Sequence, residues 1–151
     1  MQSGDQALAT VLDRARAAGV AAMVTVGTDR ETNPAAVALA ERIPGVFASV
    51  GIHPHDAGEA TDADYAAMEA LARDSPKVVA LGEMGLDFFR NLSPPDVQVS
   101  AFRRQLRLAR RLGKPVVLHV RDAHEEALAI LAEERVGDVG GVMHCFSADV
   151  A

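Results

Sequence analysis

Three apolar runs in the sequence each end on a side chain that can bind a metal ion. Glu83 follows residues 78–82, His119 follows residues 116–118, and His144 follows residues 141–143; a fourth run, residues 46–52, ends on His53. In (β/α) barrels the catalytic groups lie at the carboxyl ends of parallel strands. One carboxylate and two imidazoles suit a divalent transition metal such as Zn²⁺ or Mn²⁺. The pattern therefore predicts a metal-dependent hydrolase.

Each of these residues also has a purely structural interpretation. Glu83 could hold the loop that follows its strand, and a single histidine is more often a hydrogen-bonded core residue than a ligand. The flanking glycines, Gly82 and Gly85, allow the backbone to approach Glu83 closely. Because His119 and His144 stand at equivalent ends of separate strands, together with Glu83, metal ligation is the favoured interpretation.

Arg121 lies two residues beyond His119 and is expected on the same face of that strand. Its planar guanidinium suits a phosphate or carboxylate of a substrate. A salt bridge with Asp122 or Asp87 is the alternative.

The remaining candidates are assigned structural roles. Cys145 adjoins His144, and the two-residue alternation of a strand points it away from the histidine, so we expect a small buried hydrophobe. His55 and His124 are expected at the surface.

Helix and strand signals alternate along the whole chain. Helices are predicted over residues 6–18, 33–43, 61–74, 95–112 and 123–134, and strands over residues 21–26, 46–52, 78–82, 116–120 and 141–145. Helix-capping residues are expected at Asn33, Thr61, Ser93 and Asp122, and Gly113 is expected to end the fourth helix.

The predicted fold class is α/β, as a partial TIM barrel. Strands that are apolar throughout are typical of a parallel sheet covered by helices. The 151 residues are enough for one domain, residues 1–151, but fall short of the roughly 250 residues of a complete barrel. We therefore expect about five strands with flanking helices, without the first strand and the C-terminal units. Open sheet edges would allow self-association.

Composition restricts the class of protein further. A net charge of −6 disfavours tight, non-specific nucleic-acid binding, although bound metal ions would create a local positive field for such a substrate. The single cysteine excludes an internal disulfide and indicates a cytoplasmic protein. No apolar stretch approaches the about 20 residues that span a bilayer, and no signal peptide is evident, so no membrane partner is expected.

Four motifs resemble the TatD family of metal-dependent hydrolases in sequence and in order. They are Gly51-Ile52-His53-Pro54-His55, Gly82-Glu83-Met84-Gly85-Leu86-Asp87, Pro115-Val116-Val117-Leu118-His119-Val120-Arg121 and His144-Cys145-Phe146-Ser147. The resemblance covers essentially the whole chain. It implies a TIM barrel with two divalent cations (Mg²⁺, Mn²⁺ or Zn²⁺) and phosphodiesterase activity, chiefly on DNA, with both cations taking part.

The resemblance also implies a role for individual residues. Glu83 resembles the catalytic carboxylate that bridges both metals, and His119 and His144 resemble the other ligands of the second metal. His53 and Arg121 match positions near the substrate phosphate, and Asp87 resembles a carboxylate that supports a ligand or a loop.

The sequence departs from the family pattern in three places. It has no opening strand with a His-x-His pair, the last metal-binding aspartate of the family would lie beyond Ala151, and Ala148 replaces a usual glycine. We therefore expect this chain to keep the ligands of one metal, and to be weak or inactive alone. Two alternatives remain: another barrel metallohydrolase (an amidohydrolase or a D-aminoacyl-tRNA deacylase), or a non-catalytic remnant that oligomerises.

Overall fold

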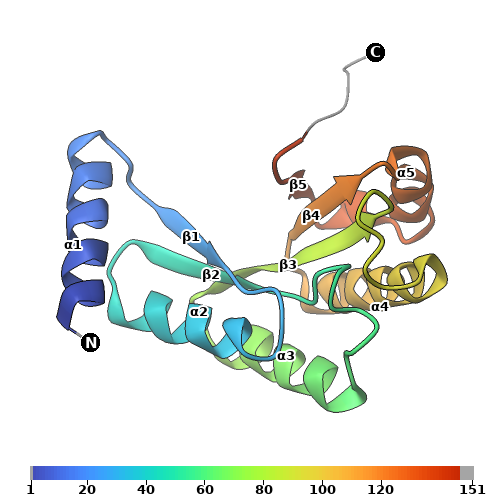
Figure 1. Ribbon diagram of the computed structural model, residues 1–151, viewed down its shortest axis with the longest axis horizontal. Coiled ribbons are helices and arrows are strands. Elements are labelled where there is room, and N and C mark those ends of the chain that lie inside the picture. Colours follow the sequence, from blue (N-terminus) through green and yellow to red (C-terminus); the bar gives the residue numbers. More distant parts are fainter. Residues whose placement is uncertain (1, 147–151) are drawn as a thin grey trace.

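Within residues 2–146, which the computed structural model describes, five parallel strands form one curved sheet (Figure 1). The strands are β1 (Met23–Val26), β2 (Val46–Val50), β3 (Val78–Asp87), β4 (Val116–Arg121) and β5 (Gly141–Met143). The helices are α1 (Gln2–Ala17), α2 (Thr32–Arg42), α3 (Asp62–Asp74), α4 (Pro95–Leu112) and α5 (His124–Glu133), and a 3₁₀ turn, η1 (Val136–Asp138), precedes β5.

The order of the strands identifies the architecture. Each strand pairs in parallel with the next one along the chain, from β1 to β5. Helices α2, α3 and α4 lie along the convex face of the sheet, and α1 stands at its β1 end (Figure 1). A doubly wound sheet would reverse its strand order and carry helices on both faces, whereas this arrangement is that of a (β/α) barrel. The predicted partial barrel is confirmed.

The hydrophobic core lies between the sheet and these helices. Val50 from β2, Met68 from α3, and Phe102 and Leu106 from α4 are almost completely buried in it. The opposite face is open at the outer strands, where Val24 of β1 and Val142 of β5 are 50% and 57% exposed. The helices therefore fix the curvature of the sheet from one side, and the strand ends remain accessible.

The helix ends confirm some predicted caps and correct others. Thr61 and Asp64 form the expected reciprocal capping box of α3, and Gly113 ends α4 at φ 63°. Asn33 is no cap, because α2 begins one residue earlier and the Asn33 side chain bonds the N–H and C=O of Gly51 instead, both at 2.9 Å. A tertiary hydrogen bond to Gly51 thus takes the place of the expected capping bond within α2.

Three further expectations are wrong. The third strand does not end at Gly82 but continues to Asp87. Cys145 is exposed rather than buried, because β5 ends at Met143 and Cys145 has a left-handed backbone (φ 50°), so strand alternation no longer applies. Asp122 likewise has a left-handed backbone (φ 53°), and no side-chain cap opens α5. Ser147 of the fourth motif and Ala148, which follows the motif, lie outside the described residues.

Candidate metal centre

The predicted site residues gather at the carboxyl ends of the strands. His53 follows β2, Glu83 and Asp87 lie on β3, His119 lies on β4, and His144 follows β5. Gly85 is paired with His119 across the β3–β4 ladder and has a φ of 148°. A side chain at Gly85 would overlap the carbonyl oxygen of His119. The glycine therefore lets β3 approach β4 closely enough to put one carboxylate on each side of the His119 ring.

Glu83 is the centre of the first cluster. Its Oε1 atom lies 3.3 Å from Nδ1 of His119 and 3.2 Å from Nδ1 of His144. The hydrogen bond with His119 is the main cause that lowers the pKa of Glu83 to about 2; burial opposes it, and His144 adds to it. Metal bonds of about 2.0–2.2 Å place two donors on one ion roughly 3–4 Å apart. Each of these two pairs therefore has a spacing that fits a divalent cation.

Asp87 holds the other side of the His119 ring. Its side chain is 1% exposed, and its Oδ2 accepts from Nε2 of His119 at 2.9 Å and from Nε2 of His55 at 2.8 Å. Burial raises the pKa of Asp87, but hydrogen bonds from the Arg90 amide and the two imidazoles outweigh it, and the pKa falls to about 2. An ionised carboxylate only accepts, so both Nε2 atoms carry protons. The Nδ1 atom of His119 is thereby left to face Glu83.

The two carboxylates change the acid–base behaviour of His119. The hydrogen bond with Glu83, and then that with Asp87, raise the pKa of His119, against the effect of burial. A cation at the Nδ1 atom would replace the proton that this environment otherwise favours.

His55 was expected at the surface, and that expectation is wrong. The side chain is 27% exposed and lies in the cluster, edge-on to His53 with ring centroids 4.3 Å apart. Its partner Asp87 is 32 residues away along the chain. No local pattern in the sequence indicates the contact with Asp87. The spacing of His53 and His55 in one loop could have indicated that both histidines belong to the site.

His53 sits between the other two imidazoles. Its ring centroid is 4.4 Å from that of His119, and its Nδ1 accepts the backbone N–H of His55 at 3.2 Å. Burial, followed by the neighbouring His119 and His55, lowers the pKa of His53 to about 4. The neutral ring therefore carries its proton on Nε2 and can donate it.

Two groups of three side chains have donor atoms within 4.8 Å of one another. One is His53, Glu83 and His119, and the other is His55, Asp87 and His119. His144 joins the first group through its contact with Glu83. The donor chemistry of the described residues thus fits a metal ion, centred on Glu83 and His119.

Arg121 does not point into this cluster of donors. Its guanidinium carbon lies 3.8 Å from the ring centroid of Phe89, in the loop after β3. Neither of the salt bridges considered from the sequence, with Asp87 or Asp122, accounts for its position. Phe89 was not singled out from the sequence, because an aromatic residue in a loop carries no periodic signal.

Helix α4 holds the loops of the site through two buried glutamines. Gln105 accepts the N–H of Ile52 at 2.8 Å and donates to its C=O at 3.0 Å. Gln98 accepts the N–H of Asp87 at 2.8 Å and donates to the C=O of Ser93 at 2.7 Å. Ser93 was expected to cap α4, but its hydroxyl bonds the C=O of His55 at 2.8 Å instead. The ends of β2 and β3 are therefore fixed by side chains of one helix.

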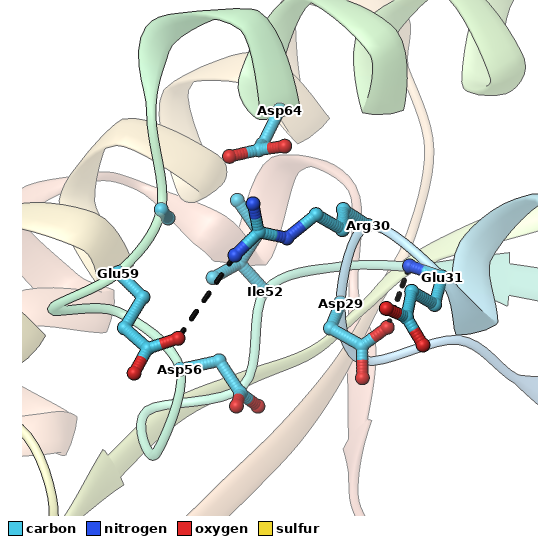
Figure 2. A pocket seen from close by; sticks show the side chains of 8 residues that line it. Asp29, Arg30, Glu31, Ile52, Asp56, Glu59 and Asp64 are labelled. Carbon is cyan, nitrogen blue, oxygen red and sulfur yellow. Dashed lines mark hydrogen bonds and ion pairs between the residues drawn. The ribbon is translucent and has the colours of Figure 1, made fainter.

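A separate acidic pocket of about 250 Å³ lies beside the β2 loop (Figure 2). Arg30 extends between carboxylates there, with its guanidinium 3.9 Å from Glu59. Asp29 accepts the N–H groups of Glu31 and Thr32, at 2.8 and 2.7 Å, at the start of α2. Asp29 therefore stabilises the N-terminal end of α2.

The comparisons with known proteins agree with the motifs. The family model described as TatD related DNase matches residues 2–151. A Bacillus subtilis protein named "Uncharacterized metal-dependent hydrolase YabD" is 44% identical over 149 residues, which are 97% of this chain and 58% of that protein. The "3'-5' ssDNA/RNA exonuclease TatD" of Cronobacter turicensis is 48% identical over 137 residues, or 91% of this chain and 52% of that protein.

A solved structure supports the fold. The TatD homolog YJJV of Escherichia coli superimposes with a TM-score of 0.88 at 34% identity, covering 97% of this chain and 56% of that one. The chain thus spans about half the length of the relatives it matches. Among the described residues, no helix is both long and apolar enough to cross a membrane. The match to the family model over residues 2–151 shows that the chain belongs to the TatD related DNase family.

Proposed function

We propose that this chain forms part of a metal-dependent phosphodiesterase that hydrolyses DNA. The observation that carries the proposal is the convergence of Glu83, His119 and Asp87 from neighbouring strand ends. The name of the Cronobacter relative, a 3'-5' ssDNA/RNA exonuclease, favours single-stranded nucleic acid as the substrate class. The same name gives no support to the alternative functions, an amidohydrolase or a deacylase.

In this proposal Glu83, His119 and His144 hold one divalent cation, of Mg²⁺, Mn²⁺ or Zn²⁺. Two divalent cations are expected in the complete family fold. When bound, the cation supplies Lewis-acid chemistry that withdraws charge from the oxygens of the phosphodiester. Because Glu83, His119 and His144 account for one cation in this proposal, we expect this chain alone to turn over slowly.

The other residues of the site position these groups and the substrate. Asp87 keeps the Nε2 proton of His119 and so directs its Nδ1 lone pair toward the cation. His53 is better suited to the substrate than to the metal, because the N–H of His55 occupies its Nδ1 and its Nε2 proton can be donated to a phosphate oxygen. The guanidinium of Arg121 is stacked on Phe89 rather than directed at the donor cluster, so a hydrogen bond from Arg121 to that phosphate stays a prediction from the sequence.

Labelled single-stranded DNA incubated with the purified chain and Mn²⁺ or Mg²⁺ tests this function. We expect slow hydrolysis that Glu83→Gln abolishes, whereas Glu126→Gln, on the exposed face of α5, retains it. Equal turnover by the Glu83→Gln variant would contradict the proposal. Hydrolysis of amide or aminoacyl ester substrates without any cleavage of DNA would instead favour the alternative metallohydrolases.

Self-association, a cytoplasmic location and the single domain over residues 1–151 also stay predictions. Within residues 2–146, β1 and β5 each have a strand neighbour on one side alone. Edges of this kind pair readily with another chain. Light scattering over a range of protein concentrations tests the association, and a constant monomer mass would contradict it.

A further inference from the structure

Phe89 is an exposed aromatic residue beside the candidate metal centre. Its side chain is 59% exposed, and the guanidinium of Arg121 is stacked on its ring at 3.8 Å. Buried aromatic residues elsewhere in the chain, such as Phe102, contribute to the core, but Phe89 does not. The contact with Arg121 covers one face of the ring, so much of its π surface remains accessible to solvent.

The position of the pair ties it to the centre. Phe89 is two residues from Asp87, so their Cα atoms are at most about 7 Å apart. Arg121 is paired with Asp87 across the β3–β4 ladder and follows His119 by two residues. A nucleic-acid strand with a phosphate at Glu83 and His119 would therefore pass close to Phe89.

The loop that carries Phe89 is held in place. The N–H of Phe88 donates to the C=O of Arg121 at 3.0 Å, and the N–H of Arg90 donates to Oδ1 of Asp87 at 2.7 Å. The N–H of Asn91 donates to the C=O of Asp87 at 3.1 Å. The aromatic ring is thus presented by an ordered loop, which lowers the entropy lost when a ligand stacks on it.

We propose that Phe89 and Arg121 form a stacking subsite for a base of single-stranded nucleic acid next to the hydrolysed phosphate. This inference rests on the proposed function and adds how the substrate is held. Aromatic rings bind single strands by stacking on bases of any sequence, and arginine contributes both its planar face and its charge. The net charge of −6 disfavours a polyanion on the rest of the surface, so the guanidinium of Arg121 supplies a local positive charge for the strand beside the Phe89 ring.

Fluorescence of a Phe89→Trp variant tests the subsite directly. The chain has no tryptophan, so the variant has a single indole, whose emission is quenched when a base stacks on it. The variant is titrated with a short oligothymidylate, and then with the same strand made of abasic spacers, with Ca²⁺ present and strand integrity verified afterwards. The control is Leu128→Trp, on α5 at a position that is 55% exposed.

We expect saturable quenching by the oligothymidylate, much weaker quenching by the abasic strand, and none in the control. The affinity of Phe89→Leu for oligothymidylate, measured by anisotropy, should fall about 5- to 100-fold, whereas Phe89→Tyr retains it. Thermal unfolding verifies that each variant folds. If one does not fold, the quenching titration decides the proposal.

The two proposals can fail separately. Hydrolysis of DNA by the chain without quenching of the Phe89→Trp variant would overturn the stacking subsite and leave the proposed function standing. Quenching by oligothymidylate together with hydrolysis that the Glu83→Gln variant retains in full would support the subsite and contradict the proposed function. Equal quenching by the abasic strand would also overturn the subsite.

Discussion

Replacement of Asp87 by asparagine should weaken metal binding without removing a metal ligand. In the structure Oδ2 of Asp87 accepts Nε2 protons from His119 and His55, and Oδ1 accepts the N–H of Arg90. An asparagine of the same size can keep the bond to Arg90 with its oxygen, but it then presents N–H donors to both rings. The His119 ring would have to accept at Nε2 and so carry its proton on Nδ1, the atom that faces Glu83.

The expected loss of metal affinity follows from the role of Asp87 in orienting the ligand His119. Removal of a carboxylate that orients a metal-binding histidine typically costs 10- to 100-fold in affinity, about 1.4–2.7 kcal/mol. Because Asp87 is 1% exposed and also holds the β3 loop, we expect the upper part of this range. The assay is a competition titration with a chromophoric Zn²⁺ chelator, comparing Asp87→Asn with Asp13→Asn on the surface of α1, which should bind like the wild type.

Nitrogen chemical shifts of the His119 ring provide an independent test of the same reasoning. We expect the wild-type ring to carry its proton on Nε2 when metal is bound, and the weakened metal complex of the variant to show altered ring shifts. Unchanged metal affinity of a folded Asp87→Asn variant would refute the argument, and so would a wild-type ring that is protonated on Nδ1 in the metal complex.

Three further predictions concern stability. Phe102→Ala should lower the free energy of unfolding in urea by about 3–5 kcal/mol, because the ring is fully buried, whereas Leu128→Ala on the surface should change it by less than about 0.5 kcal/mol; similar losses would contradict the assigned core. Gly85→Ala should cost about 1–3 kcal/mol or more, because the new Cβ meets the β4 backbone at positive φ, and Gly137→Ala, with open space around it, serves as control. Hydrogen bonds with Arg107 and then Arg103, against burial, lower the pKa of Glu134 in the folded state below its unfolded value. The folded state therefore binds fewer protons in acid than the unfolded state. The stabilisation from Glu134 is present above about pH 4.3 and is lost as the pH falls. Glu134→Gln should therefore flatten the acid limb of the stability curve measured by thermal unfolding, and an unchanged limb would contradict this assignment.

Much of the architecture could be predicted from local patterns. Continuous apolar strands alternating with amphipathic helices predict a parallel sheet, and the strand ends predict where Glu83, His119 and His144 lie. The capping box of Thr61 and Asp64 was also accessible, because both partners belong to one turn.

Several of the errors concern residues whose partners are distant in the chain. Asn33 and Ser93 have the local pattern of caps, but each bonds a loop of another strand, and His55 reaches Asp87. At such polar residues the local capping hydrogen bond competes with tertiary hydrogen bonds, and one sequence does not show which of the two forms. The roles of the site residues themselves remain predictions for the same reason, since they depend on what binds between them.

The two glutamines of α4 couple parts of the molecule that the sheet alone would leave independent. Gln98 and Gln105 stand seven residues apart on one helix, and they bond the backbone N–H groups of Asp87 and Ile52 at the ends of neighbouring strands. Exchange of either amide with deuterated solvent therefore requires α4 to separate from the sheet. The ends of β2 and β3 should accordingly open as one cooperative unit, with matching exchange rates, and a single Gln105→Ala change should accelerate exchange at both.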